Sequence, residues 1–178
     1  NAVPHFNTVR FGNDHTEGIR KGRPTPYAHV ADNDLAVGLF VEHLSQSKIW
    51  NESAVFVLED DAQNGPDHVD AHRSTAYVIS PYVKRNYVDH SMYSTTSMLR
   101  TIELILGMPP MTQYDAAANP MWHCFSAKPD FTAFTHLPAN VSLNEKNTDN
   151  TTAALISEKL DFSKEDNVPD LIFNEVLW

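Results

Sequence analysis

One stretch in the first third of the chain repeats apolar residues at helical spacing. Its apolar positions lie seven, four and three residues apart: Val30, Val37, Val41 and Leu44. These intervals place side chains on one face of an α-helix. Thr25 precedes Pro26, which is a typical helix start with threonine as the N-cap and proline at the first helical position. The pattern therefore predicts a helix that begins at Pro26 and ends near Ser45.

Three other stretches have the apolar pattern of β-strands. Residues 5–12 alternate weakly, residues 53–59 contain an unbroken apolar run (Ala54–Leu58), and residues 75–80 end at Pro81. An unbroken apolar run is typical of a strand that is covered on both faces, as in the centre of a parallel sheet. We therefore expect residues 53–59 to form a central parallel strand.

The second half of the chain contains weaker helix signals. The run Ser94–Thr96 can cap a helix that continues to Leu106 and stops at Gly107. Residues 153–160 and 171–178 are brief helix candidates in a tail that is otherwise irregular. Because strands and helices alternate along the chain, the sequence predicts an α/β fold with a mostly parallel sheet flanked by helices.

A polar segment rich in potential metal ligands follows the predicted central strand. Residues 56–73 contain the sequence FVLEDDAQNGPDHVDAHR, with these acidic and imidazole side chains after the strand end: Asp60, Asp61, Asp67, His68, Asp70 and His72. Adjacent carboxylates such as Asp60 and Asp61 repel each other unless a cation lies between them or one faces solvent. Mixed carboxylate and imidazole ligands suit Zn²⁺, Mn²⁺ or Fe, whereas oxygen ligands alone suit Mg²⁺ or Ca²⁺. The segment predicts a metal site, and the alternative is a solvated acidic turn.

A second polar loop, Asn13–Gly18, follows the predicted strand at residues 5–12 and contains Asp14 and His15. Ligands of open α/β sheets bind beyond the carboxyl ends of the strands, so we expect both polar loops to open on one edge of the sheet. The alternatives for Asp14 and His15 are a helix cap and a core histidine. Arg73 would contact a phosphate group, which its guanidinium matches, or pair with nearby carboxylates.

The overall charge limits the partners of this protein. The 178 residues include 23 acidic and 13 basic side chains, which gives a net charge of −10. Nucleic acids and anionic membranes both need a basic surface, so this balance argues against them. No apolar run approaches the roughly 20 residues that span a bilayer. Cys124 is the only cysteine, which excludes an intrachain disulfide and an all-cysteine metal site.

The acidic segment resembles a motif of the phosphoesterase family within the alkaline phosphatase superfamily, the group that contains bacterial phospholipase C and acid phosphatase A. That motif is a strand followed by Asp-Glu, a glycine and Asp-His-Val, which appear here as Asp60-Asp61, Gly65 and Asp67-His68-Val69. More closely, residues 9–125 resemble the phosphatase-type domain fused to YncE-like β-propellers. Four further motifs carry this resemblance: Asn13-Asp14-His15-Thr16, Ala31-Asp32-Asn33-Asp34, Ser80-Pro81-Tyr82 and Leu99-Arg100-Thr101-Ile102-Glu103.

The resemblance implies metal-dependent hydrolysis of phosphate esters. In that superfamily two divalent ions, commonly zinc or manganese, are held by Asp and His at strand ends; calcium and magnesium are the other options here. The residues that the resemblance assigns as metal ligands are Asp14, His15, Asp60, Asp61, His68 and His72. Asp67 and Arg73 would support the ligands or contact phosphate.

The resemblance also implies that the chain is part of a longer enzyme. The superfamily's attacking Ser or Thr lies in an N-terminal half, so we expect the nucleophile upstream of Asn1 and the missing half as a partner. Residues 1–125 would then be the C-terminal part of an incomplete, alkaline-phosphatase-like catalytic domain, inactive by itself, with an irregular extension over residues 126–178 packed on it. Family members suggest a periplasmic or secreted location.

Two alternative functions use the same residues. A sulfatase, phosphonate hydrolase or mutase would share the metal ligands and differ in nucleophile and pocket. A non-catalytic domain would hold one Ca²⁺ for rigidity, with oxygen ligands only. The expected substrate is a small-molecule or lipid phosphate ester, with no nucleic-acid partner and no membrane span.

Overall fold

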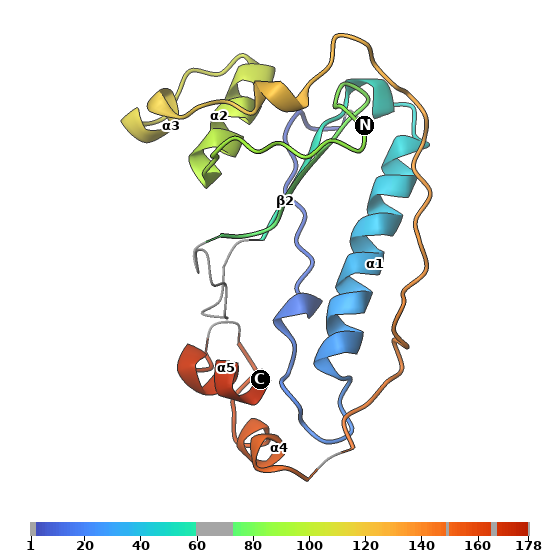
Figure 1. Ribbon diagram of the computed structural model, residues 1–178, viewed down its shortest axis with the longest axis vertical. Helices are drawn as coiled ribbons and strands as arrows, with labels where there is room; N and C mark the ends of the chain where they lie inside the picture. Colours follow the sequence, from blue (N-terminus) through green and yellow to red (C-terminus); the bar gives the residue numbers. More distant parts are fainter. Residues whose placement is uncertain (1–2, 60–72, 149, 165–166, 178) are drawn as a thin grey trace. The chain divides into compact units, whose positions relative to one another are not determined.

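The computed structural model describes residues 3–59, 73–148, 150–164 and 167–177 of the chain (Figure 1). The chain folds into two compact units, each of which combines segments that are distant in the sequence. Unit 1 contains Asn1–Thr8, Ser47–Leu58 and Ala76–Thr132, and unit 2 contains Val9–Gln46, Glu59–Thr75 and Ala133–Trp178. The predicted division into residues 1–125 and 126–178 follows the extent of the family resemblance. The two compact units do not test it, so it stays a prediction.

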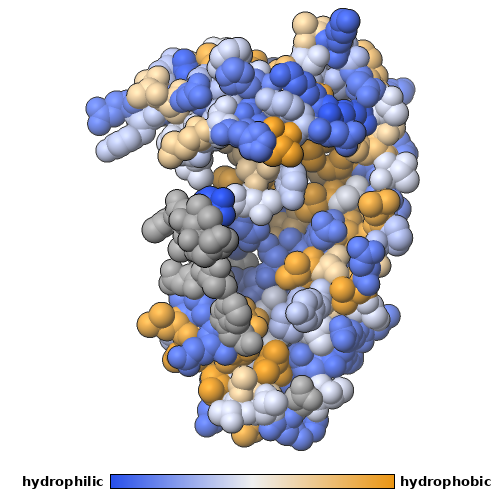
Figure 2. Space-filling model, in the orientation of Figure 1, coloured by the Kyte–Doolittle hydropathy of each residue, from blue (hydrophilic) through white to orange (hydrophobic). Residues whose placement is uncertain are grey.

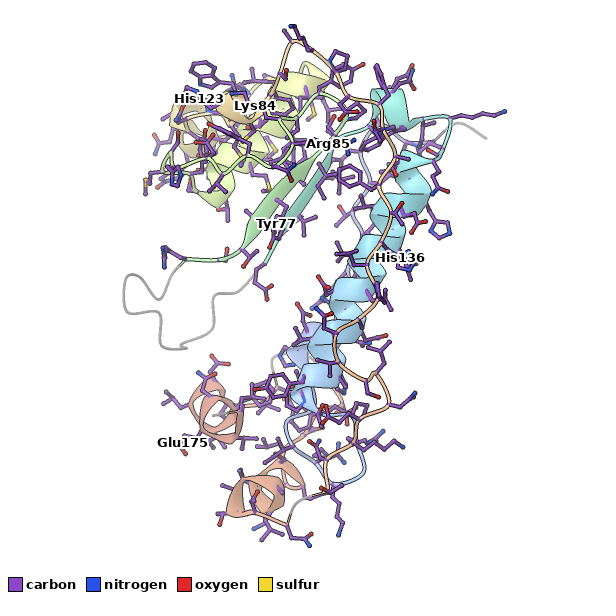
Figure 3. All side chains as sticks on the ribbon, turned by 45° about the vertical axis from the view of Figure 1, so that its right-hand side comes forward. Tyr77, Lys84, Arg85, His123, His136 and Glu175 are labelled. Atoms are coloured by element: carbon purple, nitrogen blue, oxygen red, sulfur yellow. The ribbon has the colours of Figure 1, made fainter. Side chains whose placement is uncertain are left out.

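The sheet of unit 1 consists of two antiparallel strands, β1 (Val55–Leu58) and β2 (Ala76–Ile79). Both lie where the apolar runs predict them. The register places Val57 of β1 opposite Tyr77 of β2, and Tyr77 is labelled in Figure 3. The mixture of helices and strands agrees with the predicted α/β class.

The expected mostly parallel sheet is not found among the described residues, whose sheet contains only this antiparallel pair. An apolar run indicates that a strand is shielded from water, but shielding alone does not decide the direction of its partner. Hydrogen bonds beyond the ladder support the antiparallel register at both ends. Ser80 Oγ donates to the Ser53 carbonyl at 2.9 Å, and Glu59 N donates to the Thr75 carbonyl at 3.1 Å.

The helix α2 (Thr95–Leu106) supplies part of the core of unit 1. It begins after Ser94, whose N–H donates to Ser97 Oγ at 3.2 Å, and it ends at Gly107, whose φ of 69° is the left-handed conformation that glycine tolerates. The predicted helix is therefore confirmed. Met98 of this helix forms a buried cluster with Met121 and Cys124. Phe56 of β1 and Val78 of β2 pack against this cluster. The other helical segments of unit 1 are η2 (Trp50–Glu52), α3 (Gln113–Ala117) and η3 (Trp122–Cys124).

Unit 2 is organised around α1 (Pro26–Ser45), the longest helix, with 20 residues. Thr25 caps it, because its hydroxyl accepts a hydrogen bond from Ala28 N at 3.1 Å. Pro26 occupies the first turn. The predicted helix is confirmed at both ends. Two short helices, α4 (Thr152–Ser157) and α5 (Asp170–Leu177), occupy the places where the sequence predicts brief helices.

An extended segment, residues 133–147, runs antiparallel along α1, and we call it the α1 strap (Figures 1 and 3). Three hydrogen bonds tie it to the helix and its cap: Phe134 N to Ser45 Oγ (2.9 Å), His136 N to Glu42 Oε2 (3.0 Å) and Thr25 N to the Glu145 carbonyl (3.1 Å). The His136 ring also pairs with Glu42. The contacts with His136, above all the hydrogen bond from its backbone N–H, lower the pKa of the Glu42 carboxyl.

The prediction of a strand at residues 5–12 is wrong. These residues form neither a helix nor a ladder with any described segment. Phe6 is 60% and Val9 is 52% exposed, so the weak alternation does not correspond to a buried face. The polar loop that follows begins with η1 (Asn13–His15), a short 3-10 helix.

The surface is mixed in polarity. Hydrophilic side chains prevail on the face shown in Figure 2, with apolar side chains between them. No helix among the described ranges is both long enough and apolar enough to cross a membrane.

Candidate functional site

Asp14 and His15 lie on η1, where both side chains are half-buried. Two hydrogen bonds shape this loop. Asn13 Nδ2 donates to Asp32 Oδ2 of α1 at 2.6 Å, which ties the beginning of the loop to that helix. Thr16 N donates back to the Asn13 carbonyl at 3.1 Å and closes the 3-10 turn. The pair is therefore held by local bonds and not by the end of a strand.

Thr16 is in an unusual conformation. Its φ is 59°, and its side chain is buried, with 8% exposed. A positive φ is rare for a β-branched residue, because the side chain crowds the backbone. Gly18 N donates to Thr16 Oγ1 at 3.2 Å, which helps to hold this geometry. Such strained residues concentrate at binding and catalytic sites.

The C-terminal side of the loop packs against α4 and α5. Gly18 has a φ of 62°, and a Cβ at this position would lie 2.8 Å from Ser157 Oγ and 3.2 Å from a Val176 methyl. Ile19 N donates to Ser157 Oγ at 3.2 Å. The His15 ring stacks on Phe173, with 5.5 Å between the ring centroids and 25° between the planes. Helices near the chain end thus form one wall of the loop.

The basic residues after Gly18 are engaged in local contacts. Glu17 Oε2 lies 3.4 Å from Arg20 Nη1 and 3.2 Å from Arg23 Nε. Asn147 Nδ2 donates to the carbonyls of Arg20 at 3.1 Å and Pro24 at 3.0 Å. These contacts shape the entry to α1 and do not indicate an anion site.

Most of the predicted metal ligands lie outside the described residues: Asp60, Asp61, His68 and His72, together with Asp67. The two ends of their segment are described. Glu59 and Thr75 are joined by a backbone hydrogen bond, and Arg73 is exposed. Glu59 and residues 73–75 belong to the same compact unit as η1. The described ends of the acidic segment therefore lie in the same unit as the Asp14–His15 loop.

Within the described ranges, no group of three or more His, Cys, Asp or Glu side chains could hold a metal ion. The structure brings Asp14 and His15 together on one turn. It does not test the predicted ligand set, of which these two residues are a part, so that set stays a prediction.

Residues 23–109 match the Phosphoesterase family. The matched segment is just under half of the chain and includes α1, both strands, the acidic segment and α2. The match confirms the predicted resemblance to this family and suggests a hydrolase that acts on phosphate esters. No match was found among curated proteins. The closer resemblance to the propeller-fused group stays a prediction.

The phosphoesterase segment contains Asp60, Asp61, Asp67, His68 and His72 but begins after Asp14 and His15. These two residues precede α1, and their place beside it comes from the Asn13–Asp32 hydrogen bond. Sequence reasoning assigned them by motif. The sequence did not indicate that Phe173 and Ser157 border this loop. The spacing of Phe173 and Val176, three residues apart, predicts only that both lie on one face of a helix.

A second group of titratable side chains lies in unit 1. Asp89 accepts hydrogen bonds from Ser91 N at 2.9 Å and Tyr93 OH at 3.0 Å, and Cys124 Sγ donates to it at 3.6 Å. The bond from Ser91 N is the main cause that lowers the pKa of Asp89 to about 2. Burial raises the pKa of the Tyr93 hydroxyl and of the Cys124 thiol. Because the four residues satisfy one another, they anchor the loop before α2.

Proposed function

We propose that this protein hydrolyses phosphate esters with two bound divalent metal ions. The observation that carries the proposal is the match of residues 23–109 to the Phosphoesterase family, because the matched segment contains the run of carboxylates and imidazoles after β1. Two further observations support it. The ends of that run belong to the same unit as Asp14 and His15, and Thr16 beside them has the strained backbone typical of functional loops.

The ligand atoms that Asp14 and His15 offer fit the proposed ions. A carboxylate and an imidazole on one turn suit zinc or manganese better than calcium or magnesium, which prefer oxygen ligands alone. The residues that would hold the ions are Asp14, His15, Asp60, Asp61, His68 and His72. When bound, the ions would stabilise negative charge on the phosphoryl oxygens and lower the pKa of the attacking group.

The remaining residues of the proposed site would position substrate and ligands. Arg73 is exposed beside the acidic segment, where its guanidinium can donate two parallel hydrogen bonds to phosphate oxygens. Asp67 would orient a neighbouring ligand by accepting a hydrogen bond from it. Asn13 holds the Asp14–His15 turn against α1 through its bond to Asp32.

Metal removal and a ligand substitution test the proposal together. We expect the chain alone to turn over little p-nitrophenyl phosphate, because no nucleophile is assigned among its residues. In an enzyme that also contains the nucleophile, hydrolysis should stop after chelation and return with Zn²⁺ or Mn²⁺. His15→Ala should weaken the binding of Mn²⁺, measured by calorimetry, by at least about tenfold, because ligand and supporting residues contribute this much to metal affinity. His43→Ala, which changes an exposed histidine on α1, is the matched control and should bind like the unchanged protein.

Three results would contradict or redirect the proposal. Hydrolysis that persists after complete chelation would exclude the metal-dependent mechanism. Faster turnover of p-nitrophenyl sulfate than of the phosphate would favour a sulfatase on the same scaffold. Tight metal binding without turnover of either ester, even in an enzyme that also contains the nucleophile, would favour a non-catalytic metal-binding domain.

A further inference from the structure

The helix α5 contributes one aromatic ring to the candidate site, and we propose that this ring, Phe173, is a positioning residue for His15. The role rests on the proposed function, in which His15 binds a metal ion. Phe173 would not touch the ion or the substrate. It would hold the imidazole plane in the orientation from which a ring nitrogen can reach the ion.

The contact between the two rings is a parallel stack. Their centroids are 5.5 Å apart and their planes differ by 25°, which is an offset arrangement that aromatic rings favour. The two residues are 158 positions apart in the sequence but lie in the same compact unit. A stack restricts the rotation of the His15 ring about its side-chain bonds, and this rotation decides where the ring nitrogens point.

Phe173 can serve this purpose because its own position is fixed. Its side chain is 2% exposed, the lowest exposure among the buried apolar residues after Ala28. Phe162 packs against its ring edge-on, with 5.6 Å between centroids and 65° between planes. Val176, one turn along α5, is 3% exposed, whereas Glu175 between them faces solvent and is labelled in Figure 3. The buried face of α5 is therefore the face that meets the loop.

The backbone of the loop is fixed on both sides of His15. On the N-terminal side, Asn13 is bonded to Asp32 at 2.6 Å. On the C-terminal side, Gly18 fits against Ser157 so closely that any Cβ would collide with its hydroxyl, and Ile19 N donates to the same oxygen. With the backbone held in this way, the stack on Phe173 further restricts the orientation of the His15 ring.

Metal-binding histidines usually have a supporting partner that orients the ring, and the loss of such a partner lowers metal affinity by about 10- to 100-fold. We expect Phe173→Leu, which retains an apolar side chain but removes the ring, to weaken Mn²⁺ binding by about tenfold. Phe131→Leu is the matched control, because it removes an aromatic ring that packs on Tyr82 in unit 1 and not on His15, and its affinity should be unchanged. Phe173→Tyr keeps the ring and should restore most of the affinity.

A second measurement examines the stack without any metal. Because the His15 ring stacks on Phe173, we expect the NMR signals of its ring protons to be shifted upfield by the ring current in the metal-free protein. The shift should be lost in Phe173→Leu and kept in Phe131→Leu. This measurement in the unchanged protein needs no variant to fold.

The possible results separate the two proposals. A His15 signal without an upfield shift in the unchanged protein, or one that Phe173→Leu leaves in place, would overturn the stacking contact. Loss of the shift in Phe173→Leu with unchanged Mn²⁺ affinity would overturn the positioning role. Absence of metal binding in the unchanged protein would overturn the proposed function, and the positioning role with it, although the ring-current shift would still demonstrate the contact.

Discussion

At the scale of single residues, Asp115 shows how a buried charge is stabilised by its neighbours. Its side chain is 1% exposed, and it accepts hydrogen bonds from the backbone N–H groups of Met111 at 2.6 Å and Thr112 at 2.8 Å. The hydroxyl of Thr112 donates to it as well. That hydroxyl, followed by the Met111 N–H, holds the pKa of the Asp115 carboxyl well below its usual range.

This pKa shift predicts how acid affects stability. A carboxyl whose pKa is lower in the folded protein than in the unfolded chain stabilises the fold. This stabilisation is complete above the pKa of the unfolded chain, about 4, and is lost as the pH falls through the pKa of the folded protein. We therefore expect Asp115→Asn to lower Tm at pH 7. The difference from the unchanged protein should shrink below about pH 4.

Thermal unfolding followed by circular dichroism between pH 2 and pH 8 measures the effect. Asp34→Asn changes an exposed carboxyl on α1 and serves as the control, with little change in Tm at any pH. An equal loss of Tm in Asp115→Asn at pH 7 and pH 2 would show that the substitution acts through packing and not through the charge.

Single residues also show which parts of the site local sequence can predict. Asp14 and His15 are recognisable because they form a short motif, Asn13–Thr16. Phe173 gives no such signal, because its contact with His15 depends on how a distant helix packs and not on neighbouring residues. For the same reason, the positive φ of Thr16 is not readable from the sequence, where glycine would be the expected residue.

At the scale of elements, the structure agrees with the sequence where the signals are local. The helix α1 begins at the predicted Thr25-Pro26 cap, and α2 ends at the predicted Gly107. Strand pairing is different, since the apolar run after Ser53 shows burial but contains no information about the direction of the partner. Residues 5–12 have strand-like alternation, but no described strand pairs with them, and a strand needs such pairing to complete its backbone hydrogen bonds.

The cap of α1 provides a test at this scale. The Thr25 hydroxyl accepts from Ala28 N at 3.1 Å and donates to Glu145 Oε2 of the α1 strap at 3.2 Å. Replacing an N-cap threonine by alanine costs about 1 kcal/mol, so we expect Thr25→Ala to lower the free energy of unfolding by about this amount. Urea denaturation measures it. Thr25→Ser keeps the oxygen and should recover most of the loss; equal stability of the two variants would show that the cap contributes little.

At the scale of the whole molecule, the two units could not be predicted from the sequence. Each unit is assembled from three separate segments, and no change in composition marks the points at which the chain passes from one unit to the other. Unit 2 unites the η1 loop, the ends of the acidic segment and the C-terminal helices. The tail that looked irregular in the sequence therefore supplies α4 and α5, which pack against the candidate ligand loop.

The net charge of −10 provides the last prediction, because it affects the whole molecule. Like charges repel and destabilise the compact state, and salt screens this repulsion. We expect Tm to rise between 20 mM and 300 mM NaCl in the presence of a chelator. Specific metal binding adds to this effect, since an ion at 100 times its Kd stabilises the folded state by about 2.7 kcal/mol.

Comparison at equal ionic strength separates the two contributions. Without chelator, Mn²⁺ should raise Tm more than NaCl does, and His15→Ala should reduce only this excess. The response to NaCl depends on the net charge and should be nearly the same in both proteins. If Mn²⁺ raised Tm no more than NaCl of the same ionic strength, the acidic residues would interact with cations only through general screening, and a specific metal site would be excluded.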